Sequence, residues 1–220
     1  MILAVAATPF EMRPFLDILQ GEKLSSQTLV SGVGPVEAAV CLTKFLSETT
    51  HMPTSVLNFG IGGVYFQPSP ALQPQILDIC LAEKEVFGDF GISLPDKLEY
   101  LPPSLTGNIA CHMDKHLLRD CRCILLNSRV ETIAGPFITV NAISGTRERG
   151  MMLQQRWQGL CENMEGAAIA RVCKAFDLPC LEMRCISNRV EDRNVANWRI
   201  SAACDKAART AILVVKGLMT

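Results

Sequence analysis

A helix followed at once by a buried strand, within residues 161–193, constrains this chain more than any other stretch. Residues Met164 to Phe176 predict a helix rich in small apolar side chains, and Pro179 ends it. The apolar-rich run from Cys180 to Ile186 then predicts a buried strand. Glu165 is therefore expected at a helix start and Asn188 just past a strand end, where open α/β sheets bind their ligands.

The rest of the chain alternates between short apolar runs and amphipathic stretches, which predicts an α/β fold with a mixed, mostly parallel sheet. Its 220 residues fit a single domain spanning 1–220. Strands are also expected at Ile2–Ala7, Thr28–Ser31, Thr54–Phe59, Gln75–Val86, Arg122–Ile133 and Pro136–Ala142. Helices are also expected from a Thr8 cap, and at Val36–Leu46, Cys111–Asp120, Arg147–Trp157 and Trp198–Leu218. The intervening 87–107 excursion is long enough to serve as a lid or an interface.

Composition excludes several classes of protein. A formal net charge of −1 provides no basic surface for nucleic acid. No apolar run reaches membrane-spanning length, and the N-terminal residues do not resemble a secretory leader. The ten cysteines are best explained as reduced core thiols of a cytoplasmic protein, with no disulfide framework.

Two motifs resemble one known family. MEGAAIARVC at 164–173, followed by MRCISN at 183–188, is similar to the M-E-x-A-A…R-x-I-S-[DN] pattern of nucleoside phosphorylases and nucleosidases. ISNRVEDR at 186–193 resembles a hydrolytic branch of this family that acts on a hypoxanthine nucleoside. The resemblance covers nearly the whole chain. It implies a three-layer, nucleoside phosphorylase-like fold whose central sheet is flanked by helices, cleavage of a purine N-glycosidic bond, no cofactor, and a homo-oligomer (dimer or tetramer). The apolar regions 66–77 and 87–101 are the candidate interface.

Breaking an N-glycosidic bond builds positive charge on the ribose, and carboxylates stabilise such a transition state. The resemblance implies that Glu165 grips the ribose hydroxyls, while Met164 packs under the sugar. A carboxylate suits that task because charge-assisted hydrogen bonds are the strong ones. The competing interpretation is a glutamate that only complements the dipole of its own helix.

Glu11 is the candidate general base. Its segment AATPFEM resembles the region in which hydrolytic members place the glutamate that activates water. Glu11 also follows the first predicted strand, so it is expected near a strand end, where partial desolvation favours proton transfer. A first-turn helical acid with no ligand is the alternative.

Asn188 occupies the position where adenine-specific relatives carry an aspartate that protonates the leaving base. An amide cannot give up a proton at neutral pH, but it can donate a hydrogen bond to N7 or to a 6-oxo oxygen. The sequence therefore favours hypoxanthine or guanine over adenine. A strand-ending turn asparagine is the structural alternative.

Further substrate contacts are expected at Gly62, in the Gly60–Gly63 turn, and at Ile143 and Ser144, where the family places base-stacking residues. Arg193, or Arg189, could pair with an acidic group on the 5′ side of the nucleoside, because a guanidinium binds a carboxylate in a fork. Core packing for Ile143 and a solvated loop for the arginines are the alternatives.

His112 and His116 have helical spacing, but neither H-E-x-x-H nor a C-x-x-C pair is present, so no metal site is predicted. Three functions remain open: a hydrolase that uses water, a phosphorylase of the same fold, and a nucleoside-binding or storage protein. The turns at 32–35 and 60–63 contain no arginine or lysine for phosphate, which favours water.

Overall fold

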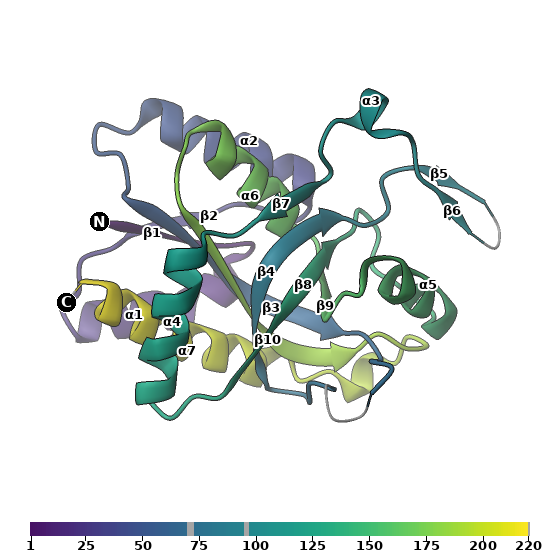
Figure 1. Cartoon of the computed structure of the whole chain (residues 1–220). Coiled ribbons are helices and arrows are strands. Elements are labelled where there is room, and N and C mark those ends of the chain that lie inside the picture. Colours follow the sequence, from purple (N-terminus) through teal and green to yellow (C-terminus); the bar gives the residue numbers. More distant parts are fainter. Residues whose placement is uncertain (70–72, 95–96, 220) are drawn as a thin grey trace.

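A mixed sheet of eight strands lies between two layers of helices (Figure 1). The computed structural model describes residues 1–69, 73–94 and 97–219. The strands of this sheet are β1 (Ile2–Ala6), β2 (Gln27–Val30), β3 (Ser55–Val64), β4 (Ile79–Phe87), β7 (Ala110–His112), β8 (Thr132–Thr139), β9 (Cys161–Asn163) and β10 (Cys180–Arg189). The helices are α1 (Pro9–Gly21), α2 (Pro35–Glu48), α3 (Pro103–Thr106), α4 (Lys115–Asn127), α5 (Arg147–Trp157), α6 (Gly166–Ala175) and α7 (Ile200–Met219).

The sheet follows the order β10-β4-β8-β9-β3-β1-β2, and β7 adds to β4. Because β10 also pairs with β3, the strands β3, β9, β8, β4 and β10 close into a ring, from which β1 and β2 continue. Pairing is antiparallel for β10–β4, β3–β9 and β4–β7, and parallel for the other pairs. The expected mixed, mostly parallel sheet is confirmed.

Helices α1, α4 and α7 cover one face of the sheet, and α2 and α6 cover the other (Figure 1). All five residues of β1 are buried, because helices cover both faces of the sheet at this strand, which lies between β3 and β2. Two clusters of buried apolar side chains result, one under each helical layer. Within the described residues, no helix is both long and apolar enough to cross a membrane.

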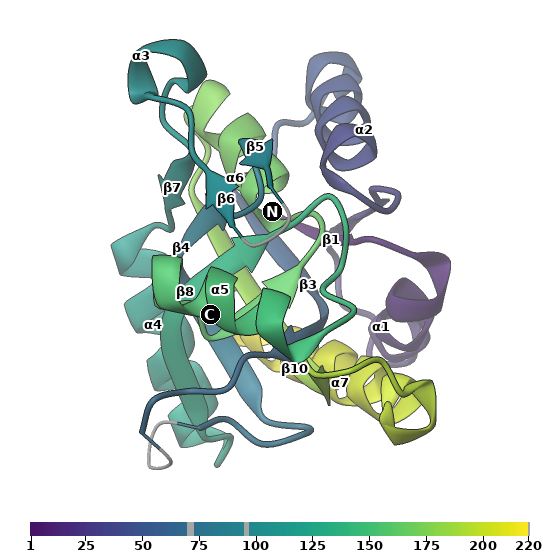
Figure 2. The same cartoon turned by 90° about the vertical axis from the view of Figure 1, so that its right-hand side faces the viewer.

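The long 87–107 excursion is less irregular than expected. Its described part holds a two-stranded hairpin, β5 (Ile92–Ser93) with β6 (Leu98–Glu99), and the short helix α3. These elements project from the end of the sheet that lies away from α1 and α7 (Figures 1 and 2).

Three local predictions were wrong. The helix expected at Cys111–Asp120 begins later, as α4, because Asp114 caps it by accepting hydrogen bonds from the backbone N–H groups of His116 and Leu117. This helix continues to Asn127, so a single strand, β8, replaces the two expected at Arg122–Ile133 and Pro136–Ala142. His112 therefore lies on β7 and His116 on α4, rather than together on one helix.

The third error concerns the ends of two strands. The glycines at 60–63 form no turn, because they continue β3 and pair with β10, and Gly63 pairs also with β9. Asn188 likewise lies inside β10, which runs to Arg189 with an irregularity between Ile186 and Asn188. Both segments extend further than expected because they pair with each other, Gly60–Gly63 of β3 lying alongside Arg184–Asn188 of β10.

Candidate active site

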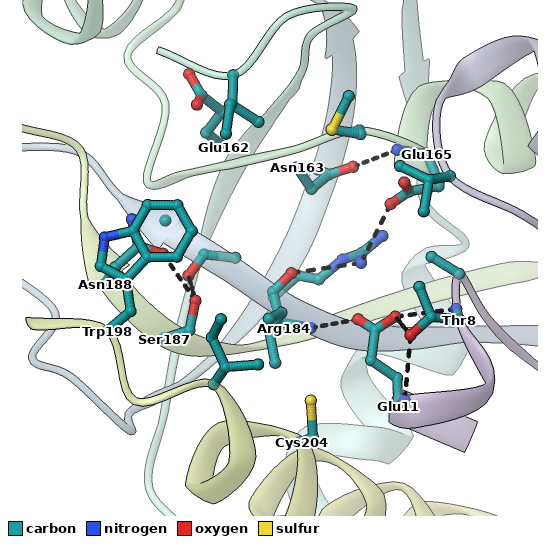
Figure 3. A pocket seen from close by; sticks show the side chains of 18 of the residues that line it. Thr8, Glu11, Glu162, Asn163, Glu165, Arg184, Ser187, Asn188, Trp198 and Cys204 are labelled. Atoms are coloured by element: carbon teal, nitrogen blue, oxygen red, sulfur yellow. Dashed lines mark hydrogen bonds and ion pairs between the residues drawn. The ribbon is translucent and has the colours of Figure 1, made fainter. Parts of the chain in front are cut away.

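A cavity of about 420 Å³ opens beside the central strands, within the size range of small-molecule sites. It receives side chains from α1, β3, β9, β10 and α7 and from the loops between them (Figure 3). Seven of the eight residues predicted from the sequence line it: Glu11, Gly62, Ile143, Ser144, Met164, Glu165 and Asn188. The eighth, Arg193, does not.

Glu11 is held by the cap of its own helix. As the sequence indicated, Thr8 caps α1: the Glu11 Oε2 atom accepts hydrogen bonds from the Thr8 N–H (3.1 Å) and hydroxyl (2.8 Å). Its Oε1 atom accepts from the Ile61 N–H at 3.1 Å on β3. The side chain is buried yet lines the cavity, so its carboxylate is fixed in place before any ligand arrives.

Glu165 sits at the start of α6, as predicted, and is held from the opposite side. Its Oε1 atom accepts from the Gly34 N–H at 3.0 Å, in a turn where Gly34 has a φ of +92° that favours glycine. Burial raises the pKa of Glu165, while the Arg184 guanidinium and the Gly34 N–H oppose that rise.

Arg184 lies near both of these glutamates and, of the two, forms an ion pair with Glu165. Its Nη1 atom is 3.6 Å from Glu165 Oε2. A Cβ atom on Gly60 would lie 2.5 Å from Glu11 Oε1 and 2.8 Å from Arg184 Nη1, so only glycine leaves room for this approach. Burial acts to lower the pKa of Arg184, but the carboxylates of Glu182, Glu165 and Glu11 outweigh it, so the pKa is raised and the guanidinium stays charged.

Sequence reasoning assigned Arg184 no role, although a signal was present. Glu182 and Arg184 are two residues apart on a buried strand, so both side chains project to one side of it. They form an ion pair at 2.8 Å, with a further Nε–Oε1 hydrogen bond at 2.9 Å. Two opposite charges at this spacing in an apolar strand indicate a buried pair. We call Glu11, Glu165 and Arg184 the guanidinium end of the cavity.

A second buried acid lies behind Glu182. Glu85 accepts hydrogen bonds from the Thr139 hydroxyl (2.8 Å) and the Asn163 amide, and a side chain on Gly166 would meet oxygens of both Glu85 and Glu182. Burial, and then the charge of Glu182, raise the pKa of Glu85 well above its usual range. These acids lie close to the N-terminus of α6, where backbone N–H groups favour negative charge.

Asn188 lies at the other end of the cavity, which we call the amide end (Figure 3). Its Oδ1 atom accepts a hydrogen bond from the Ser187 hydroxyl at 2.8 Å, and its Nδ2 atom donates to the Arg189 carbonyl at 3.1 Å. These bonds fix which way the amide faces. One N–H of the NH₂ group remains for a ligand, since an amide carries two.

Glu162, on β9, also lines the cavity and was missed, although it lies within the stretch that the sequence singled out. Its carboxylate accepts hydrogen bonds from the Tyr65 hydroxyl at 2.9 Å and from the Ser144 N–H and hydroxyl at 2.8 and 2.6 Å. Burial raises its pKa, and the bonds from Ser144 and Tyr65 counteract that rise. A three-residue strand is too short for sequence periodicity to reveal.

Among the residues that the structure describes, Trp198, just before α7, is one of two aromatic side chains that line the cavity, with Phe10 of α1, and its place there was not predicted. The exposed Arg193 guanidinium lies 5.1 Å from the centre of this ring. Arg193 is therefore one side chain away from the cavity. Arg189 is exposed and donates a hydrogen bond to the Gln75 side chain at 3.4 Å.

Comparison with known proteins identifies the family of this chain. The family description "Phosphorylase superfamily" matches residues 18–220. The chain therefore belongs to the phosphorylase superfamily. Two curated relatives are futalosine hydrolases. The one from Thermus thermophilus is 29% identical over 82% of this chain and 77% of its own length, and the one from Streptomyces coelicolor is 29% identical over 80% and 72%.

Solved structures share the fold. A Helicobacter pylori 5′-methylthioadenosine/S-adenosylhomocysteine nucleosidase superposes with a TM-score of 0.83 at 19% identity, covering 98% of this chain and 97% of its own. The futalosine hydrolase of the same organism superposes with a TM-score of 0.82 at 19% identity, covering 98% of both chains. The three-layer nucleosidase architecture implied by the sequence motifs is confirmed.

Proposed function

We propose that this protein is a nucleosidase that hydrolyses the N-glycosidic bond of futalosine and releases hypoxanthine. The observation that carries this proposal is the convergence of Glu11 and Glu165 on one guanidinium, in a cavity whose other end presents the Asn188 amide. The similarity to futalosine hydrolases over four-fifths of the chain supports it. On the same resemblance we place the reaction in menaquinone biosynthesis.

Each end of the cavity has a distinct task in this reaction. Glu165 accepts hydrogen bonds from the ribose hydroxyls, and Glu11 takes a proton from the attacking water. Asn188 donates a hydrogen bond to N7 or O6 of the departing base, which carries negative charge as the bond breaks. The positive charge that develops on the ribose faces two carboxylates that are already oriented.

Water suits this cavity better than phosphate as the nucleophile. In the part of the chain that the structure describes, Arg184 is the one arginine or lysine lining the cavity, and Glu182 already neutralises it. A phosphate entering there would meet Glu11 and Glu165, so like charges would oppose its binding.

The assay is base release from futalosine, inosine and 5′-methylthioadenosine, each with and without phosphate. We expect hypoxanthine from futalosine at a rate that is independent of phosphate. Phosphate dependence would show a phosphorylase, and adenine release in preference to hypoxanthine would show an adenine-type nucleosidase. No turnover of any nucleoside would favour a binding protein.

Arg193 is our candidate for binding the acidic 5′ substituent of futalosine. Its guanidinium rests on Trp198, which lines the cavity, so a modest movement of that side chain would bring it to the rim. Arg193→Met should raise the KM for futalosine and leave that for inosine unchanged. Arg189→Met is the matched control; equal effects of Arg193→Met on both substrates would remove the assignment.

We also propose that the protein is a homo-oligomer. Val36, Val40 and Phe90 expose 70%, 60% and 47% of their surface around a second hollow between α2, α6 and the 87–109 segment. Apolar surface of this kind is typical of protein interfaces. Sedimentation should show a dimer or tetramer that Val36→Glu combined with Val40→Glu converts to monomer. The interface that the sequence suggested at 66–77 lies partly outside the described residues.

A further inference from the structure

One wall of the cavity is an irregular segment between β8 and α5. We call residues 141–145 the wall segment, because Ile143 and Ser144 line the cavity. Ser144 is partly buried, and the other four residues are exposed. Few apolar contacts therefore hold the wall segment, so its shape depends on the hydrogen bonds that it makes.

Asp89, from the 87–107 excursion, binds the start of the wall segment. Its carboxylate accepts hydrogen bonds from the Asn141 N–H at 3.0 and 3.1 Å and from the Asn141 side-chain amide at 3.2 Å. It also accepts from the Ala142 N–H at 3.4 Å. The Asp89 side chain is only 8% exposed. A carboxylate this well shielded from water makes strong hydrogen bonds, so it fixes where the wall segment begins.

Arg149, on α5, completes this arrangement. Its Nη2 atom lies 3.0 Å from Asp89 Oδ2 and donates to the Ala142 carbonyl at 3.2 Å. Asp89 therefore accepts from the N–H groups at the start of the wall segment, while Arg149 donates to a carbonyl there. We call Asp89 and Arg149 the clamp.

The other end of the wall segment has separate anchors. The Ser144 N–H donates to Glu162 at 2.8 Å, and the Gly145 carbonyl accepts from the Arg193 N–H at 3.1 Å. Ile143 lies between these anchors and the clamp. Loss of the clamp would leave Ile143 held from one side only.

The proposed catalytic glutamates are held elsewhere. Glu11 is bound by the cap of α1 and by β3, and Glu165 by the turn before α2. Asp89 and Arg149 do not line the cavity. Loss of the clamp should therefore weaken substrate binding while bond cleavage in the bound complex stays nearly intact.

We propose that Asp89, supported by Arg149, is a positioning residue that holds the wall segment in its substrate-binding arrangement. This inference rests on the proposed nucleosidase function. It concerns how tightly a nucleoside binds and leaves the choice of base unchanged. If the binding arrangement is populated for only a fraction of the time, the apparent affinity falls by that fraction.

The kinetic test is Asp89→Ala. The KM for futalosine and for inosine should rise by about 10- to 30-fold, with kcat within about threefold of wild type, because only the population of the binding arrangement changes. Asp120→Ala, which breaks an exposed pair with Arg119 on α4, is the matched control and should change neither constant. An unchanged KM, or a loss of kcat as large as the rise in KM, would overturn the proposal.

Two further variants grade the effect. Asp89→Asn keeps one acceptor oxygen for the Asn141 N–H, so its KM should rise by only about 3- to 10-fold, and it replaces Asp89→Ala should that variant fail to fold. Arg149→Met leaves Asp89 with its backbone hydrogen bonds and should raise KM by about three- to fivefold. A larger effect from Arg149→Met than from Asp89→Ala would reverse the order of the two roles and contradict the assignment to Asp89.

Hydrogen exchange followed by NMR tests the positioning without any activity. In Asp89→Ala the Asn141 amide loses its acceptor directly, so the decisive amide is that of Ser144, whose acceptor Glu162 is untouched. If the clamp positions the whole wall segment, exchange at Ser144 should accelerate by about tenfold. Unchanged exchange at Ser144 would confine Asp89 to a local contact and contradict the proposal.

The two tests also separate this inference from the proposed function. If wild type hydrolyses no nucleoside, the nucleosidase assignment fails, and exchange at Ser144 still decides whether Asp89 positions the wall segment. If wild type hydrolyses futalosine and Asp89→Ala retains its KM, the positioning role alone fails.

Discussion

The guanidinium end and the amide end of the cavity hold their acids in different ways. At the guanidinium end, a buried cation is paired with Glu182 and Glu165, and the charge of Glu11 lies close enough to stabilise it further. At the amide end, Glu162 is held by neutral hydroxyl and N–H donors. The first arrangement keeps charges fixed, whereas the amide end also leaves one N–H of Asn188 for a ligand.

This difference separates catalysis from selection. Fixed charges stabilise a transition state because they need no reorganisation when the bond breaks. An unused N–H donor instead penalises any ligand that cannot accept from it, which is a device for specificity. Changes at the guanidinium end should therefore slow all substrates, whereas changes at the amide end should alter which base is preferred.

The largest effect is expected from Glu11→Gln. Because the amide cannot take a proton from water, kcat/KM for futalosine and inosine should both fall by about 10²- to 10⁴-fold. Asp17→Asn, on an exposed position of the same helix, is the matched control and should leave both rates unchanged. Retention of more than a tenth of wild-type activity in Glu11→Gln would exclude this residue as the base.

Arg184→Met tests whether the residues of the guanidinium end depend on one another for stability and activity. Removal of the cation leaves Glu182 buried and unpaired, so urea unfolding should show a loss of about 3 to 5 kcal/mol. Adding Glu182→Leu should restore part of this stability, since the more deeply buried of the two unpaired charges is then gone, while Glu165 keeps its hydrogen bond from the Gly34 N–H. Activity should stay at least about 100-fold low in both variants, because Glu165 has lost the group that positions it. Recovery of activity together with stability would reduce Arg184 to a structural role.

Asn188→Asp acts on the amide end. An aspartic acid can donate a proton to N7 but, once ionised, repels O6, so the preference should shift toward adenine nucleosides by about tenfold. Inosine and adenosine kinetics measure this ratio, with Asn197→Asp as an exposed control outside the cavity. An unchanged preference would argue against the interpretation of this amide.

The positions of several residues at the two ends of the cavity could be predicted from the sequence. The two motifs located Glu165 and Asn188, and the Thr8 cap located Glu11, because caps and helix starts are local features. The strand order could not be predicted from the sequence. The ring of strands that brings β9, β3 and β10 together could not be predicted either. Long-range pairing depends on contacts between residues far apart in the chain, which local periodicity does not encode.

Two cavity residues that the sequence did not predict, Arg184 and Glu162, also depend on contacts between distant parts of the chain. Arg184 and Glu162 acquire their roles from partners on other segments of the chain. Arg184 pairs with Glu165, which is 19 residues away in the sequence, and Glu162 accepts from Tyr65, which is 97 residues away. The glycines of β3 misled the prediction because glycine weakens strand propensity, and here their value is the space they leave for Glu11, Arg184 and Asn188.

The smallest effect on activity is expected from Glu85→Gln, behind the guanidinium end. The raised pKa of Glu85 means that the folded protein holds a proton there that the unfolded chain releases above about pH 4.5. Folding stability should therefore fall as pH rises, by at most about 1.4 kcal/mol per pH unit for this one group, until the pH passes the folded-state pKa. Glu85→Gln cannot release a proton and should show a flatter dependence of urea midpoint on pH between about 5 and 8.

Activity of Glu85→Gln toward futalosine should remain within about threefold of wild type, since Glu85 does not line the cavity. Glu131→Gln, at an exposed position, should reproduce the wild-type pH dependence. If Glu85→Gln instead abolished activity while folding normally, the acids behind Arg184 would have to be counted as part of the guanidinium end. If the urea midpoint of wild type and of Glu85→Gln changed with pH in parallel, Glu85 would be ionised in the folded protein. Arg184 would then compensate two buried carboxylates behind the cavity, Glu85 and Glu182, rather than one.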